Sequence, residues 1–306
     1  MCGIIGYIGD KQASDVVLGG LTALEYRGYD SVGLAYLNAS GQGHVIKQSG
    51  RVENLIPIVK DKVPACHIAI GHTRWATHGL PNSINAHPHA NNAQDIFVVH
   101  NGIIENYQEL REQLIKQGYS FKSETDTEVI PNLIDYYAGR LGNFEDGLKA
   151  ALNDLKGAFA IALITSRKPE TIYAARLSSP LVIGVGKTKE HILASDPNAI
   201  LEHTKDVVFL LDYDLAIIRS GKLEIENFHL SSKRQPTIEL LDYDTQQAAL
   251  GSFPNFMLKE IFEAPQTIQS ATLGRVLASE GIIKLGGLET INSQLGYIDR
   301  WVSLLQ

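Results

Sequence analysis

The order of apolar runs along this chain limits its possible folds more than any other feature. Strand-like runs fill most of the first hundred residues, three helical stretches follow between residues 106 and 155, and short apolar runs separated by turn residues return over residues 158–228. Two sheets with helices packed on their outer faces would bury such an arrangement. We therefore expect a layered α/β (α+β) domain.

Individual runs are specific enough to place elements. The run CGIIGYIG is rich in β-branched residues, is bounded by glycine and starts at Cys2, so the first strand begins beside that cysteine. A helix is expected over residues 11–26 and another over 52–60, with strands over 31–38, 44–50, 67–74 and 95–102. Later helices are expected over 106–117, within 123–137 and over 144–155, with Asn106 as a possible cap of the first.

The composition changes after residue 230. The stretch SSKRQPTIELLDYD is polar and contains Pro236, and it leads into the helix-like stretches at residues 255–269 and 291–305. We expect a large domain over residues 1–230, a linker over 231–250 and the start of another domain over 251–306. The apolar face of residues 288–305 would lack a partner surface, so we expect poor order there.

Bulk composition excludes several classes of protein. Hydrophobic residues make up 44% and charged residues 20%, and no run approaches the ~18 apolar residues of a membrane span. The formal net charge of −7 comes without a basic stripe, which argues against nucleic acid as a partner. Two cysteines are too few for a disulfide framework, and no basic or apolar leader precedes Cys2. We expect a cytoplasmic protein that is not bound to a membrane.

Cys2 combines two chemical groups on one residue if Met1 is removed. A side chain this small normally permits removal of Met1, which leaves a thiol and a free α-amino group together. The amino group has an ordinary pKa of roughly 7.8, so part of it is unprotonated at neutral pH. It can take the thiol proton, directly or through one water, and the thiolate can then form a thioester with a substrate carbonyl. The alternative is that Cys2 is merely a small residue on an edge strand.

Six sequence blocks favour the catalytic interpretation. They are CGIIGYIG, LEYRGYDSVGLA, GHTRWATHG, NAHPH, VHNGIIENY and SETDTEVI. In this order they resemble the amino-terminal domain of the glutamine-fructose-6-phosphate aminotransferase family, a class II glutamine amidotransferase domain. The resemblance covers residues 2 to about 240 and continues more weakly through MLKEIFEAP. It implies a four-layer αββα sandwich of the Ntn-hydrolase type, hydrolysis of L-glutamine through a Cys2 thioester, and a role in amino-sugar biosynthesis.

The resemblance also assigns site residues. Arg74 would bind the α-carboxylate of glutamine through its planar guanidinium, and Asp126 would accept hydrogen bonds from the α-ammonium. Together they would select free glutamine over peptides and simple amides, which lack one or both charges. Asn101 would contribute its side-chain amide, and Gly102 its backbone N–H, to an oxyanion hole.

Four further residues are assigned in the same way. Thr77 and His78 would line the glutamine pocket, and Trp75 would gate a passage for ammonia toward an acceptor domain. Arg27, in the block LEYRGYDSVGLA, would help fix the nucleophile end of the site. For Arg27, Thr77 and His78 the alternative is structural support of loops. No cofactor and no metal are expected.

In this family a long sugar-phosphate isomerase region follows, receives the ammonia and converts fructose 6-phosphate to glucosamine 6-phosphate. The 56 residues after the linker, 251–306, are too few for such a domain. We therefore expect this chain alone to hydrolyse glutamine, to reach fructose 6-phosphate only through a carboxy-terminal domain, and to come from a homo-oligomeric parent protein.

Two other functions remain open. One is a sibling amidotransferase that feeds ammonia to a different acceptor. The other is a catalytically silent sensor that binds glutamine, or binds a metal through the histidines that crowd this region. Six histidines fall within 34 positions but lack the spacing of a known metal motif. They are His67, His72, His78, His87, His89 and His100. Cys66 is most simply a small core residue.

Overall fold

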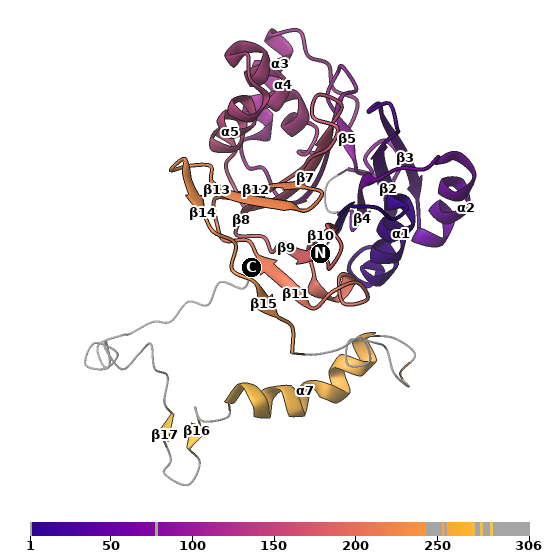
Figure 1. Cartoon of the computed structure of the whole chain (residues 1–306), viewed down its shortest axis with the longest axis vertical. Coiled ribbons are helices and arrows are strands. Elements are labelled where there is room, and N and C mark those ends of the chain that lie inside the picture. Colours follow the sequence, from indigo (N-terminus) through magenta and orange to yellow (C-terminus); the bar gives the residue numbers. More distant parts are fainter. Residues whose placement is uncertain are drawn as a thin grey trace. The chain divides into compact units, whose positions relative to one another are not determined.

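Two antiparallel sheets form the centre of the first of two units, residues 1–248 and 249–306 (Figure 1). The computed structural model describes residues 2–76, 79–242, 253, 256–272, 276–277 and 282–283. Across the first sheet, in spatial order, run β15 (Glu239–Leu240), β11 (Asp206–Phe209), β9 (Val182–Val185), β10 (His191–Ala194), β1 (Gly3–Ile8), β4 (Ile68–Arg74), β2 (Ser31–Leu37) and β3 (Gly43–Ser49). Across the second run β14 (Ser232–Arg234), β13 (Lys222–Asn227), β12 (Asp214–Arg219), β8 (Ile172–Leu177), β7 (Phe159–Thr165), β6 (Ile96–Gly102) and β5 (His89–Ala90).

Helices cover the outer faces of both sheets (Figure 1). The first sheet carries α1 (Ala13–Ala23) and α2 (Val52–Lys62), and the second carries α3 (Tyr107–Lys116), α4 (Val129–Leu141) and α5 (Phe144–Asp154). Two single-turn helices, η1 (Glu25–Arg27) and η2 (Pro197–Ala199), lie in connections. The predicted αββα order of layers is confirmed.

The alternation of side chains along each strand explains why four layers form. On β1, Ile4 and Ile8 belong to the apolar cluster between the sheets, whereas Ile5 and Tyr7 belong to the cluster beneath α1. Successive side chains of a strand point to opposite faces, so a strand that is apolar at every position must be covered on both sides. The β6 strand does the same for the second sheet, with Phe97 between the sheets and Val98 beneath the helices.

Two local expectations differ from the structure. Asn106 stands at the cap position of α3, but its side chain makes no cap hydrogen bond. Instead its amide donates to the Asp154 carbonyl and accepts from the Lys156 N–H, so it ties the start of α3 to the end of α5. The expected linker also contains short strands, because β14 pairs with β13 and β15 pairs with β11.

The second unit contains α7 (Phe256–Thr272), which covers the helix expected at residues 255–269, and the hairpin strands β16 (Val276–Leu277) and β17 (Ile282–Ile283). The helix-like stretch at residues 291–305, and the poor order that we expected at 288–306, lie outside the described residues.

Candidate active site

Cys2 lies directly before β1, an inner strand of the first sheet. At this end of β1 the chain contacts Asn101 of β6 in the second sheet. In the pairing of β1 with β4, Gly3 stands opposite Thr73, so the chain places Cys2 beside the end of β4. The backbone N–H of Trp75 donates to Cys2 Sγ over 3.2 Å, and Sγ in turn lies 3.6 Å from the Trp75 carbonyl oxygen. The strand pairing therefore aims the thiol at the loop that follows β4.

The surroundings of Cys2 keep its thiol protonated at rest. Burial is the largest influence and raises the pKa of the Cys2 thiol, while the Trp75 N–H and the charge of Arg74 act in the opposite direction and do not cancel it. A neutral thiol is a weak nucleophile, so the site requires a base to remove the proton when substrate is bound.

Asn101 reaches Cys2 from the second sheet, and Gly102 follows it at the end of β6. The Asn101 side chain donates from Nδ2 to the Cys2 carbonyl oxygen over 3.0 Å. Gly102 ends β6 with a φ of +126°, and a Cβ at this position would lie 2.0 Å from the Ala158 carbonyl oxygen. Only glycine fits there, because such a φ is strained for other residues and the backbone of residue 158 is already close. The structure thus brings together the two residues predicted to form an oxyanion hole.

Arg74 and Asp126 supply opposite charges next to this point. Arg74 ends β4 and is only 4% exposed, and burial lowers the pKa of its guanidinium although Cys2, Asp126 and Asp30 favour the charged form. Asp126 Oδ2 accepts the Ile104 N–H over 2.8 Å, which holds the carboxylate beside the segment that follows Gly102. A buried guanidinium and a nearby carboxylate are the two charges that complement an amino acid zwitterion.

Trp75 is 43% exposed, and its ring meets Tyr29 edge-on with 5.3 Å between the centroids. Thr77 and His78, which we also assigned to the pocket, lie outside the described residues. The described part of the loop is therefore open to solvent at Trp75 and anchored at Cys2.

Arg27 is linked to the strand of Cys2 through Asp196 and its neighbour Ser195. Its guanidinium pairs with Asp196 over 2.5 Å, and Tyr26 donates to the same carboxylate oxygen over 2.6 Å. The neighbouring Ser195 exchanges hydrogen bonds with Ile4, because its Oγ accepts the Ile4 N–H and its N–H donates to the Ile4 carbonyl. Arg27 thus secures the strand that carries Cys2 without a hydrogen bond to Cys2 itself.

Sequence reasoning missed Asp30, which organises the same loop. Its carboxylate accepts the Ala76 N–H over 2.8 Å, and its own N–H donates to the Arg74 carbonyl over 3.0 Å. Asp30 therefore holds the backbone on both sides of Trp75. Its position in the block LEYRGYDSVGLA was the available signal, but a lone carboxylate gives no indication of which loop it will bind.

Four of the clustered histidines are buried behind the site. His72, His87, His89 and His100 are each at most 5% exposed, and burial lowers the pKa of each. The rings of His72 and His87 lie 4.1 Å apart, and those of His87 and His89 lie 4.8 Å apart. Within the described residues, no group of three or more His, Cys, Asp or Glu side chains is arranged to hold a metal ion. Cys66 is buried in the apolar cluster beneath α1, as a core residue.

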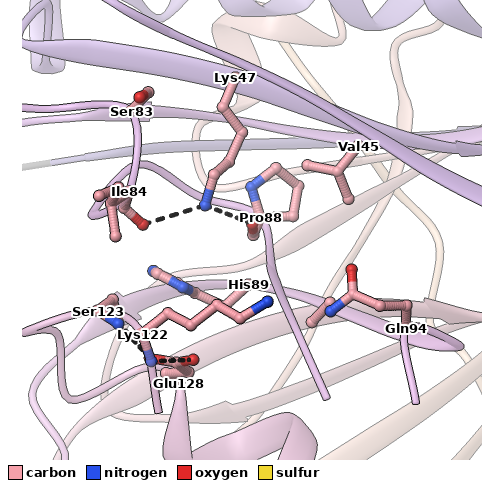
Figure 2. A pocket seen from close by; sticks show the side chains of 11 residues that line it. Val45, Lys47, Ser83, Ile84, Pro88, His89, Gln94, Lys122, Ser123 and Glu128 are labelled. Atoms are coloured by element: carbon pink, nitrogen blue, oxygen red, sulfur yellow. Dashed lines mark hydrogen bonds between the residues drawn. The ribbon is translucent and has the colours of Figure 1, made fainter. Parts of the chain in front are cut away.

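A cavity of about 640 Å³ lies beside these histidines (Figure 2). Lys47, His89 and Glu128 are among the residues that line it. Glu128 accepts the N–H groups of Lys122 and Ser123, and Lys47 donates to the carbonyls of Ile84, Ala86 and Pro88. Lys47 and Glu128 thus form hydrogen bonds with backbone groups around the cavity, and Lys47 holds the segment that contains His87.

No helix in the described part of the chain has the length and apolar character needed to cross a lipid bilayer.

Comparisons with known proteins agree with this geometry. Residues 72–202 match a family described as a glutamine amidotransferase domain. The chain is 43% identical over 300 residues to a glutamine-fructose-6-phosphate aminotransferase (isomerizing) of Clostridium acetobutylicum, covering 98% of this chain and 48% of the relative. It is 46% identical over 280 residues to the protein of the same name from Bacteroides thetaiotaomicron, covering 90% of this chain and 45% of the relative. The chain thus spans about half the length of the curated relatives it matches.

Among solved structures, the glutamine phosphoribosylpyrophosphate amidotransferase of B. subtilis superimposes with a TM-score of 0.64 at 26% identity. The similarity covers 76% of this chain and 50% of that chain. A glutamine aminotransferase class-II domain protein of Silicibacter pomeroyi shares the fold at 19% identity, with a TM-score of 0.53, over 74% of this chain and 99% of that chain. The family match over residues 72–202 includes Arg74, Asn101 and Asp126.

Proposed function

We propose that this chain, which matches a glutamine amidotransferase domain over residues 72–202, hydrolyses L-glutamine to glutamate and ammonia through a thioester on Cys2. One observation carries the proposal: donors from both sheets hold Cys2, because its thiol accepts the Trp75 N–H after β4 and its backbone carbonyl accepts the Asn101 amide of β6. A nucleophile beside a preorganised donor is what acyl transfer requires.

The reaction follows from these positions. With Met1 removed, the α-amino group of Cys2 takes the thiol proton, and Sγ attacks the side-chain carbonyl carbon of glutamine. Asn101 Nδ2 and the Gly102 N–H stabilise the negative charge that develops on the carbonyl oxygen. The C–N bond breaks, and the leaving nitrogen takes the proton from the amino group and departs as ammonia. Water then attacks the thioester, which releases glutamate and restores the thiol.

Arg74 and Asp126 give this reaction its selectivity. The buried guanidinium of Arg74 binds the α-carboxylate of glutamine, and Asp126 accepts from the α-ammonium, so amides that lack these charges lose both contacts. Thr77 and His78 line the same pocket in this proposal, and Arg27 stabilises the strand that carries the nucleophile.

The acceptor of the ammonia is fructose 6-phosphate in this proposal, so the parent protein makes glucosamine 6-phosphate. The identities of 43% and 46% to aminotransferases of that name, against 26% to the phosphoribosylpyrophosphate enzyme, support this acceptor. Residues 1–230 form the glutaminase domain, and residues 251–306 begin the sugar-phosphate isomerase domain. Trp75 gates a passage for ammonia toward an acceptor domain. We further place the parent protein in the cytoplasm as a homo-oligomer.

Covalent trapping tests the proposed function. A glutamine analogue that carries an electrophile at the side-chain carbonyl is expected to label Cys2 stoichiometrically, and peptide mass spectrometry locates the adduct. Cys2→Ala should reduce glutamate release by at least about 10³-fold, since it removes the nucleophile. Cys66→Ala is the matched control, because Cys66 is a buried thiol outside the site, and it should keep the activity. Full activity of Cys2→Ala, or labelling at Cys66 instead, would contradict the proposal.

A further inference from the structure

One buried histidine contacts Asn101 directly. His72 Nε2 lies 3.0 Å from Asn101 Oδ1 and 3.1 Å from the His100 carbonyl oxygen. Both of these neighbours are oxygen atoms that accept hydrogen bonds. His72 Nε2 must therefore carry the hydrogen and donate to them, because an unprotonated ring nitrogen would face two acceptors.

The position of His72 keeps its ring neutral in this form. The residue is 0% exposed, and Nδ1 is buried without a hydrogen-bond partner in the part of the chain that the structure describes. Burial lowers the pKa of His72 to about 3, so a second proton does not bind near neutral pH. The single hydrogen of the neutral ring thus stays on Nε2.

We propose that His72 is a positioning residue that fixes which way the Asn101 amide points. Its Nε2–H holds Oδ1 of Asn101, and this leaves Nδ2 directed at Cys2, where it donates to the Cys2 carbonyl over 3.0 Å. A rotated amide would put two donors together at His72 and two acceptors together at Cys2. The hydrogen bond from His72 to Asn101 Oδ1 therefore directs the amide N–H, and not the amide C=O, toward the developing oxyanion. This inference rests on the proposed function and deepens it.

Packing holds His72 in place from behind. Its ring stacks on His87, whose Nε2 lies 2.8 Å from Thr127 Oγ1, and the same hydroxyl lies 2.9 Å from His100 Nδ1. A Cβ on Gly33 would lie 2.1 Å from the His87 carbonyl oxygen, so the segment of His87 is seated directly on β2.

Lys47 holds the same segment from the cavity side, because it donates to the carbonyls of Ile84 and Pro88 over 3.2 Å each (Figure 2) and to that of Ala86 over 2.5 Å. The His87 ring is therefore fixed by its own chain neighbours as well as by Thr127. A rigid support of this kind is what keeps a catalytic donor within a fraction of an ångström of its productive position.

Variants of His72 separate orientation from mere packing. His72→Gln can place an amide N–H near the position of Nε2, whereas the side chain of His72→Asn is too short to reach it. We expect His72→Asn to lower kcat about 10- to 100-fold with KM within about twofold. The reason is that an oxyanion donor stabilises the transition state more than the bound substrate, so turning it away slows the reaction without weakening binding. His72→Gln should recover most of that loss. Equal losses in both variants would overturn the proposal.

A double-mutant cycle with Asn101→Ala gives the second test. Once the Asn101 amide is absent, His72→Asn should change kcat by less than about twofold, since there is nothing left to orient. If the fold-loss in kcat of the double variant equals the product of the two single fold-losses, the residues act independently and the proposal is overturned. His191→Gln is the control: His191 is also buried with an unpartnered Nδ1, but it pairs with Ile8 at the far end of β1. It should leave kcat within about twofold.

Nitrogen NMR of the unmodified protein needs no activity and no variant. The ring of His72 should give the signals of the Nε2–H form at every pH between about 8 and 5. Detection of the Nδ1–H form of His72, or protonation of its ring within that pH range, would overturn the proposal that His72 orients Asn101. A protein that shows the Nε2–H form but hydrolyses no glutamine would refute the proposed function and leave the orientation of Asn101 intact.

Discussion

The two sheets contribute to the candidate site in different ways. From the first sheet come Cys2 and the loop of Trp75, whose backbone N–H groups donate to Cys2 and Asp30; the Trp75 residue is 43% exposed. From the second comes Asn101, whose amide contacts the buried ring of His72 on β4, in the interior between the sheets. One half is a loop anchored at a few points, whereas the other is part of the packed interior.

This difference matches what each half must do. A nucleophile must admit substrate and release products, and loops near solvent provide such access. An oxyanion donor must not reorganise while charge develops, and buried packing provides that rigidity. The following expectations either sharpen this contrast or break it.

The largest expected effect is a loss of stability in acid that originates in the buried half. The four buried histidines have folded pKa values below the ordinary value of about 6.5, so below that pH the unfolded chain binds more protons than the folded chain. Stability must then fall as the pH falls, by up to about 5 kcal/mol per pH unit once all four protonate in the unfolded chain. Urea unfolding at pH 7.5, 6.5 and 5.5 measures this loss.

The matched variant is His89→Gln, which removes one of these groups. It should lower by about one the number of protons taken up on unfolding in acid, and so reduce the slope of the free energy of unfolding against pH. If the free energy of unfolding is the same at pH 5.5 and 7.5, the buried half does not carry the acid sensitivity.

Asn101→Ala should have the next largest effect, on catalysis. Removal of one oxyanion donor typically lowers kcat about 10²- to 10³-fold, and KM should change little because the charge exists only in the transition state. Alkylation of Cys2 by iodoacetamide, which needs no oxyanion hole, should keep its wild-type rate. Loss of alkylation together with kcat would mean that Asn101 supports the nucleophile and that the two halves are not separate.

Gly102→Ala tests how tightly the second half is packed. Its Cβ would collide with the Ala158 carbonyl, and its φ of +126° adds strain, so we expect a loss of about 2 to 4 kcal/mol in the free energy of unfolding. Gly118→Ala is the control, because Gly118 also has a positive φ but no atom within 4 Å of the added Cβ. It should cost only about 1 kcal/mol. Equal costs for the two variants would show that the contact at Ala158 is readily relieved.

Trp75→Ala should have the smallest effect on stability. The side chain is exposed and meets Tyr29 only edge-on, so the free energy of unfolding should change by less than about 1 kcal/mol. Its backbone N–H, which contacts Cys2, remains. Glutamate release by this chain should stay within about tenfold of the wild type, and a complete loss would mean that the exposed half is as rigid as the buried one.

Much of the fold follows from local patterns in the sequence. The strands β1 to β4 and β6 to β13 and the helices α1, α2, α3, α4 and α5 lie where alternation and helical spacing predicted them, because those patterns report directly which faces are buried. Short pairings such as β14 with β13 escaped notice, since three residues carry no period. Asn106 was assigned correctly to a helix start, but its hydrogen bonds go to residues that only the folded chain brings near.

The candidate site divides in the same way. Arg74, Asn101, Gly102 and Asp126 were named because their sequence blocks resemble a known family, whereas Cys2 could also be named from the chemistry of a terminal thiol and amine. Asp30 and His72 could not, since their roles consist of which backbone group or amide they touch.

The sequence by itself therefore predicted the order of layers and the candidate reactive groups, because the period of burial and the side-chain chemistry can be read from the residues. Only the tertiary structure decided how those groups face one another. Residues 2, 75 and 101 meet through pairing of β1 with β4 and contact between two sheets, and the hydrogen on His72 is placed by two oxygen atoms 28 and 29 positions further along the chain. Such contacts depend on distances in space, which no local pattern encodes.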